Sequence, residues 1–165
     1  MEKIDENKFV DLVDKHQNLI HKICKLYTNS TAEHKDLFQE ITIQLWKAYP
    51  KFRGDSKFST WMYRVGINTA ITIYRKSKRR IRSDNFDDVS YKIPEDNPYN
   101  DQEDKQLEAI YEAVKALNDI EKAIVFLYLE DKSYREISET IGLTEVNARV
   151  KMNRIKNKLK KQLNP

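Results

Sequence analysis

Apolar residues recur every three and four positions through most of this chain, the spacing that places them along one face of an α-helix. Residues 7–28 (NKFVDLVDKHQNLIHKICKLYT) and 36–49 (DLFQEITIQLWKAY) show this spacing, so we predict a helix over each. Further helices are expected from residue 58 to about residue 80, over 107–117 and over 118–131. Only three glycines interrupt the 165 residues, which also favours helices. We therefore predict an all-α fold.

Two short segments are expected to break the helical pattern in the first half. Residues 29–35 (NSTAEHK) are polar and predict a turn between the first two helices. Residues 50–56 (PKFRGDS) contain a proline and a glycine and predict a loop. Either Asp55 or Ser56 can cap the helix that follows this loop.

Residues 83–106 show no sustained period and contain two prolines, with eight acidic residues against two basic ones. This composition is typical of a flexible linker. It divides the chain into two small helical domains, residues 1–82 and 107–165. Basic residues outnumber acidic ones in both domains, 17 to 9 and 11 to 9, so both ends fit contact with nucleic acid.

The last third of the chain carries the local signals of a helix-turn-helix. Ser133 and Glu136 form a capping box, Gly142 falls where a helix would end, and Thr144 can cap a final basic helix. In a helix-turn-helix the second helix enters the major groove and presents its first turns to base edges. An ordinary helical hairpin remains the alternative on this pattern alone.

The predicted final helix offers side chains suited to reading bases and to binding phosphates. Arg and Lys can donate to guanine, Asn can pair with adenine, and Val can touch a thymine methyl. The candidates for base contact are Asn147, Arg149, Val150, Lys151, Asn153 and Arg154. The candidates for phosphate contact are Lys156, Lys158, Lys160 and Lys161. The residues from which inward packing is expected are Val146, Val150, Ile155 and Leu159.

The stretch FSTWMYRVGINTA, residues 58–70, places three aromatic residues just before the basic run YRKSKRRIR. Aromatic rings among cations favour single-stranded nucleic acid, because bases stack on the rings while the cations follow the backbone. The candidate rings are Phe52, Phe58, Trp61 and Tyr63. Phe58 and Met62 share a face with Val65 and are expected in the core, and whether Trp61 is core or stacking platform stays open.

The sequence argues against several other classes of protein. No phosphate-binding loop or Ser-His-Asp grouping is evident, so an enzyme is not expected, and no cofactor is expected. His16, His21, Cys24 and His34 raise the possibility of a metal site, but a core cysteine with surface histidines is favoured. The single cysteine, the lack of a signal-peptide pattern and the lack of a long apolar segment indicate a cytoplasmic protein without membrane insertion.

The two motifs together resemble the sigma-70 family of bacterial RNA polymerase sigma factors, in particular its small extracytoplasmic-function (ECF) type. Residues 36–80 are similar to that family's region two, and residues 117–161 to its region four. The pattern departs from the family in Val146-Asn147, where Gly-Thr is frequent, and in Gly66, where alanine is frequent. These departures bear on which DNA bases the chain would prefer, and not on its membership of the family.

The resemblance implies a role for each group of residues. A polymerase-binding patch that docks on the clamp coiled coil would comprise Asp36, Gln39 and Glu40. Residues that recognise and melt the minus-ten element would be Phe52, Arg53, Phe58, Trp61, Tyr63, Arg64, Asn68, Arg75, Arg79 and Arg80. Residues that read the minus-thirty-five element would be Thr144, Asn147, Arg149, Val150, Lys151, Asn153 and Arg154.

The implied partners are core RNA polymerase, through its clamp coiled coil and flap, promoter DNA and an anti-sigma factor. The implied function is to direct core polymerase to specific promoters and to help melt the minus-ten element. The competing interpretation is a helix-turn-helix regulator with an N-terminal helical sensor domain, which explains the second motif but not the aromatic and basic residues of the first.

Overall fold

The computed structural model describes residues 5–84 and 101–164, and within these ranges every regular element is a helix. The elements are α1 (Glu6–Tyr27), α2 (Thr31–Ala48), a 3₁₀ turn η1 (Tyr49–Lys51), α3 (Phe58–Asp84), α4 (Asp101–Lys115), α5 (Asp119–Leu129), α6 (Tyr134–Ile141) and α7 (Glu145–Leu163). The all-α prediction is confirmed. The chain forms two compact units, Met1–Ile93 and Pro94–Pro165, each with its own core.

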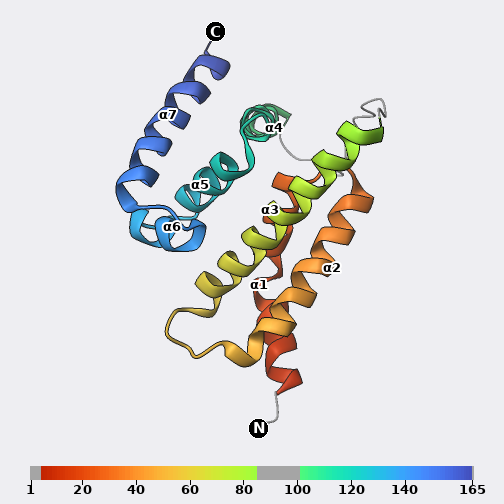
Figure 1. The fold of residues 1–165 in the computed structure, drawn as a ribbon. Coiled ribbons are helices and arrows are strands. Elements are labelled where there is room, and N and C mark those ends of the chain that lie inside the picture. Colours follow the sequence, from red (N-terminus) through yellow and green to blue (C-terminus); the bar gives the residue numbers. More distant parts are fainter. Residues whose placement is uncertain (1–4, 85–100, 165) are drawn as a thin grey trace. The chain divides into compact units, whose positions relative to one another are not determined.

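In the N-terminal unit, α1, α2 and α3 pack on one another as a three-helix bundle (Figure 1). Ile20 on α1, Ile41 and Leu45 on α2, and Ile67 on α3 have no exposed surface. There is little space beside Gly66, because a Cβ there would lie 3.0 Å from Cδ1 of Ile23 on α1. A glycine therefore lets α3 lie close against its neighbours.

The connection between α1 and α2 is shorter than the predicted turn over residues 29–35. Ser30 caps α2 by accepting a hydrogen bond from the backbone N–H of Glu33 (3.1 Å), and the Glu33 carboxylate accepts one from the N–H of Asn29 (2.9 Å). The first bond satisfies an N–H group in the first turn of α2, and the second ties the residue before the cap to that turn. α2 therefore begins at Thr31 and includes most of the polar segment.

The loop between α2 and α3 starts in η1 and contains Gly54 in the left-handed conformation, with φ of 77°. The predicted cap at Asp55 or Ser56 is displaced by one residue from Ser56 and by two from Asp55. The first hydrogen bond of α3 runs from the N–H of Trp61 to the carbonyl of Lys57 at 3.1 Å, so Lys57 takes the cap position.

The two helices that flank the predicted linker extend into it. α3 continues to Asp84 and α4 already begins at Asp101, so the helical part of 83–106 includes residues 83, 84 and 101–106. Residues 101–106 (DQEDKQ) contain no apolar side chain, and a search for apolar periodicity therefore misses this helical turn. The remainder of the linker, residues 85–100, lies outside the described residues.

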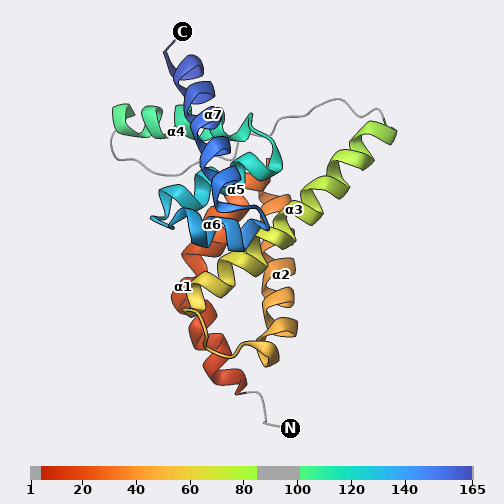
Figure 2. The ribbon, with the colours of Figure 1, turned by 60° about the vertical axis from the view of Figure 1, so that its left-hand side comes forward.

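In the C-terminal unit, α5, α6 and α7 pack against one another (Figure 2). Ile124, Leu127, Ile137 and Ile155 are among the fully buried residues of this unit. The capping box of Ser133 with Glu136 opens α6, as predicted.

The turn between α6 and α7 also follows the prediction. Gly142 ends α6 with φ of 83°, and the N–H groups of Gly142 and Leu143 both donate to the carbonyl of Ser138 (2.8 and 3.1 Å). Thr144 then caps α7. These local bonds fix the start of α7 relative to α6, as a helix-turn-helix requires.

No described helix is both long and apolar enough to cross a membrane.

Candidate nucleic-acid and polymerase interfaces

An aromatic cluster gathers at the loop between α2 and α3. The ring of Trp61 lies 5.0 Å from that of Phe52, 5.4 Å from Phe58 and 6.3 Å from Tyr49, measured between centroids. All four rings are partly exposed. Trp61 is therefore half-buried within this cluster, so it is not a fully buried core residue, and its role as a stacking platform stays a prediction.

The same cluster continues into the core of the bundle. Tyr49 lies 5.1 Å from Phe9 of α1, and Phe9 in turn lies 5.0 Å from Trp46. Phe58, which was expected in the core, is only half-buried, whereas Met62 is fully buried as expected. The accessible rings thus rest on a packed aromatic base, which fixes their position without a ligand.

Tyr63 does not belong to this accessible surface, and the contact of its ring with DNA stays a prediction. Its side chain is 4% exposed, beside Met62 and Ile67 in the core. α3 contacts both α1 and α2, so it buries a wide face that includes position 63. Arg64 and Asn68, one turn apart, lie on the exposed side instead.

Basic side chains continue along the exposed end of α3. Arg75, Arg79 and Arg80 are exposed, as is Arg53 in the loop. The ammonium of Lys78 lies 4.8 Å from the centroid of the Tyr74 ring. Aromatic rings near cations provide stacking surfaces and phosphate partners, the combination that suits binding of a single strand.

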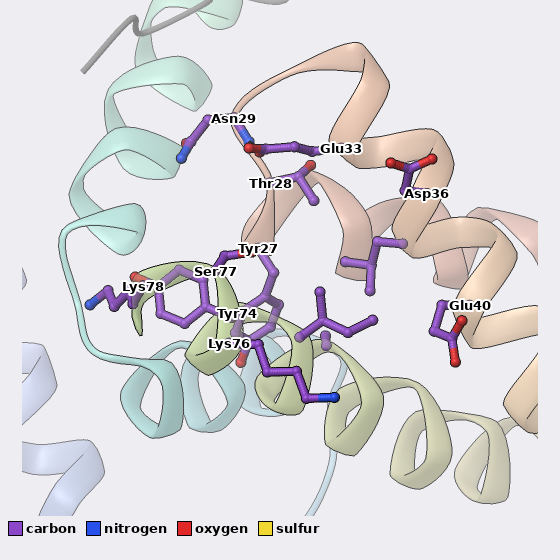
Figure 3. Close-up of a pocket in the computed structure, with 13 residues that line it drawn as sticks. Tyr27, Thr28, Asn29, Glu33, Asp36, Glu40, Tyr74, Lys76, Ser77 and Lys78 are labelled. Carbon is purple, nitrogen blue, oxygen red and sulfur yellow. The ribbon is translucent and has the colours of Figure 1, made fainter. Parts of the chain in front are cut away.

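Two of the three predicted polymerase-binding residues of α2 border a pocket of about 750 Å³ (Figure 3). Asp36 and Glu40 line it together with Glu33, whereas Gln39 is exposed but not among the lining residues. The Glu40 carboxylate also accepts a hydrogen bond from Nε2 of Gln44 at 2.9 Å. One wall of the pocket is therefore acidic.

Sequence reasoning missed the rest of this pocket. Tyr27 from α1 and Tyr74, Lys76 and Lys78 from α3 share it with the acidic wall. In the sequence, Lys76 and Lys78 stand out only as members of the basic run YRKSKRRIR, and nothing there assigns them to a pocket. Their place in the same pocket as the carboxylates depends on how α3 packs against α2, which spacing along the chain does not reveal.

The exposed face of α7 carries most of the predicted base-reading residues. Those that are exposed are Asn147, Arg149, Val150, Asn153 and Arg154, and Lys151 is half-buried. Thr144 uses its hydroxyl to accept the N–H of Asn147 at 3.1 Å, so its observed role is to cap the helix. Apart from Val150, these residues are polar or basic, a composition suited to base edges.

The expected inward packing of α7 requires a correction. Val146 is 71% exposed and Val150 is 43% exposed, whereas Ala148, Met152 and Ile155 are buried. The buried residues are spaced by four and three positions, so they define the inner stripe and place Val146 and Val150 outside it. Ile155 packs inward as predicted.

Two of the four lysines proposed for phosphate contact have partners on α5. Lys158 Nζ lies 2.9 Å from a carboxylate oxygen of Glu121. Lys156 Nζ lies 3.2 Å from the hydroxyl of Tyr128 and 4.7 Å from the centroid of its ring. Lys160 and Lys161 are exposed near the end of α7.

The histidines and the cysteine do not gather into one cluster. Cys24 is buried, and burial raises the pKa of its thiol to about 12. His21 Nδ1 and His34 Nε2 lie 2.9 Å apart on neighbouring helices, a contact that sequence analysis missed. Burial, and then the charge of His21, lower the pKa of His34. Among the described residues no three His, Cys, Asp or Glu side chains are placed to hold a metal ion.

Comparison with known proteins identifies both units. The family model for sigma-70 region 2 matches residues 12–80, and the model for sigma-70 region 4 matches residues 107–159. The ECF RNA polymerase sigma-E factor of Haemophilus influenzae is 28% identical over 171 residues, which cover 98% of this chain and 90% of that protein. The factor of the same name from Escherichia coli is 30% identical over 148 residues, covering 84% of this chain and 77% of that protein.

Solved structures share the fold at lower sequence identity. The sigma factor RpoE, in complex with the anti-sigma factor NepR from Bartonella quintana, has a TM-score of 0.77 at 16% identity and covers 94% of this chain and 96% of its own. CnrH, in complex with the cytosolic domain of CnrY, has a TM-score of 0.68 at 17% identity and covers 97% and 90%. The match of the N-terminal unit to region 2 does not favour a regulator with a sensor domain. This chain belongs to the sigma-70 family of RNA polymerase sigma factors and is of the ECF type.

Proposed function

We propose that this sigma factor binds core RNA polymerase through α2, melts the minus-ten element with α3 and its preceding loop, and reads the minus-thirty-five element with α7. The observation that carries the proposal is the pairing of two surfaces in one chain. An accessible aromatic cluster is followed by cations on α3, and an exposed recognition face lies on a capped α7. The first surface suits unpaired bases and the second suits duplex DNA.

The polymerase contact is assigned to Asp36, Gln39 and Glu40. The acidic wall formed with Glu33 would attract basic side chains of the clamp coiled coil, and exposed Gln39 would add hydrogen bonds. The flap of the polymerase is the expected partner of the C-terminal unit.

The minus-ten contact is assigned to the accessible rings and to the polar side chains near them. Phe52, Phe58 and Trp61 would stack on unpaired bases, at about 1–3 kcal/mol per stacked base. Arg53, Arg64 and Asn68 would contact bases and backbone at the same end of α3, and Arg75, Arg79 and Arg80 would follow the phosphates. We assign Tyr63 an indirect part in this contact, as the buried ring that supports the accessible side of α3.

The minus-thirty-five contact is assigned to the exposed face of α7. Its base-reading residues would be Asn147, Arg149, Val150, Lys151, Asn153 and Arg154, while Thr144 holds the helix start toward the groove. The exposure of Val150 supports contact with a thymine methyl. Lys160 and Lys161 would bind phosphates without regard to sequence.

Three further assignments follow from the family. The solved complex of the sigma factor RpoE with the anti-sigma factor NepR supports an anti-sigma factor as a partner of this chain also. The chain would act in the cytoplasm, where bacterial transcription takes place. It would contribute binding and strand opening, while the polymerase carries out the chemistry.

The proposal is tested by run-off transcription with core polymerase and genomic fragments, which also identifies a promoter. Transcripts with defined start sites are expected only when the chain is present. Permanganate should then detect unpaired thymines upstream of those start sites. A chain that binds core polymerase but opens no DNA would overturn the minus-ten assignment.

A further inference from the structure

Arg149, in the second turn of α7, is held by two neighbours. Its guanidinium Cζ lies 4.9 Å from the centroid of the Tyr134 ring, and Nη2 lies 3.1 Å from a carboxylate oxygen of Glu145. The Arg149 side chain is nevertheless 60% exposed. Tyr134 is the first residue of α6, so the contact joins the two helices of the helix-turn-helix.

These contacts leave Arg149 able to bind a base. A guanidinium has five N–H donors, and the ion pair with Glu145 is made through Nη2. An aromatic ring attracts a cation through its face and does not occupy N–H donors. Tyr134 therefore restricts where the guanidinium lies without competing for the hydrogen bonds that a guanine would accept.

The Tyr134 ring is itself fixed by its surroundings. The capping box at Ser133 sets the first turn of α6, in which Tyr134 lies. The Tyr128 ring of α5 lies 6.3 Å from the Tyr134 ring, and Lys156 of α7 donates to the Tyr128 hydroxyl. A half-buried ring with neighbours on two helices forms a stable support for a long, mobile arginine side chain.

Pre-ordering of an arginine matters for specificity because a bidentate contact tolerates little misplacement. An arginine that moves freely loses side-chain entropy when it binds guanine, and it can also reach neighbouring base pairs or phosphates. Support from Tyr134 would lower that cost for one base position. The benefit would fall on discrimination between bases more than on general affinity for DNA.

We propose that Tyr134 is a positioning residue that sets base specificity by holding Arg149 against one base pair of the minus-thirty-five element. The inference rests on the proposed function, in which Arg149 reads a base. Tyr134 is not among the residues assigned above to DNA contact and acts through Arg149.

The test measures the affinity of the complete chain, bound to core polymerase, for duplexes that carry one promoter from the run-off experiment. Each base pair of the minus-thirty-five element is replaced in turn. Arg149→Ala should remove discrimination at its base pair, a loss of about 5- to 150-fold. Tyr134→Leu should lower discrimination at the same base pair by about two- to fivefold and leave other positions unchanged. Tyr134→Phe retains the ring and should retain discrimination.

A matched control and a double variant separate positioning from a structural effect. Arg135 on α6 forms the same kind of pair, with Glu139 at 3.3 Å, and Arg135→Ala should leave the discrimination ratio unchanged. In the Arg149→Ala background, Tyr134→Leu should cause no further loss of discrimination.

Three outcomes would contradict the inference in distinguishable ways. If Arg149→Ala leaves discrimination intact, the base-reading role of Arg149 fails, and the inference fails with it. If Arg149→Ala removes discrimination but Tyr134→Leu only weakens binding evenly across duplexes, Tyr134 is structural and the positioning role is refuted. A loss in Tyr134→Phe as large as in Tyr134→Leu would show that the hydroxyl, and not the ring face, is responsible.

Discussion

Tyr63→Ala is expected to destabilise the N-terminal unit instead of acting on DNA directly. The Tyr63 side chain is 4% exposed, and Met62 and Ile67 beside it are fully buried. Truncating a buried aromatic residue costs about 3 to 5 kcal/mol, from lost burial and from the cavity left behind. In a unit of this size each kcal/mol corresponds to roughly 4–8 °C, so a loss of 3 kcal/mol should lower the unfolding temperature by about 12–24 °C.

Trp61→Leu provides the contrast, because Trp61 is half-buried and Leu retains apolar bulk but no stacking surface. We expect a loss of about 1 to 2 kcal/mol in stability. The polymerase complex should still bind promoter duplex but should open the minus-ten region poorly. A template with a pre-melted mismatch bubble should restore much of its transcription, since the missing stacking energy is needed only to keep bases out of the duplex.

Thermal unfolding and permanganate footprinting of both variants, on duplex and bubble templates, decide between the two roles. Tyr63→Ala should lose opening, core binding and duplex binding together as the unit unfolds, and the bubble should not rescue it. The reasoning is refuted if Tyr63→Ala unfolds within about 4 °C of the parent and shows a selective opening defect that the bubble repairs. Normal opening by a stable Trp61→Leu protein would refute the stacking role of Trp61.

Three further predictions address polymerase docking, packing and pH. Replacing Asp36 and Glu40 with Lys should weaken binding to core polymerase by about tenfold or more, which corresponds to about 1.4 kcal/mol, with little change in unfolding temperature. Unchanged affinity in an anisotropy titration would exclude a role for these acidic residues in polymerase binding. Gly66→Ala should lower stability by about 1 kcal/mol, because overpacking against Cδ1 of Ile23 at 3.0 Å outweighs the helix propensity gained. In an Ile23→Val background, which lacks that atom, denaturant titration should show Gly66→Ala to be stabilising. Because the pKa of His34 is lowered, the folded state binds a proton at His34 less tightly than the unfolded chain does. The free energy of unfolding should therefore fall as pH drops through about 6.5. The His34→Gln variant should show a flatter dependence of this free energy on pH.

Features encoded by neighbouring residues were predictable from the sequence. The capping box of Ser133 with Glu136, the left-handed Gly142 and the Thr144 cap all depend on residues within one or two turns, and the structure has each of them. The residue at which α2 begins was harder to predict, because several residues of the polar segment 29–35 can cap a helix. Ser30 takes that role through its bond with Glu33.

Features that depend on packing between helices were not predictable. Periodicity shows that α3 has an apolar face but not that it contacts two other helices, which is why Tyr63 is buried while Arg64 is exposed. Pairs distant in sequence, such as His21 with His34 and Lys158 with Glu121, exist only after the helices pack. In each case the residue types were visible in the sequence but their partners were not.

The most direct test of the central claim is transcription by core polymerase that lacks any other sigma factor. Run-off transcription on genomic fragments with the purified chain should yield transcripts with defined start sites, and their upstream regions should share a minus-thirty-five and a minus-ten element. Substitution of either element should abolish the transcript. If the chain binds promoter duplex but neither associates with core polymerase nor supports specific initiation, its role as a sigma factor is contradicted.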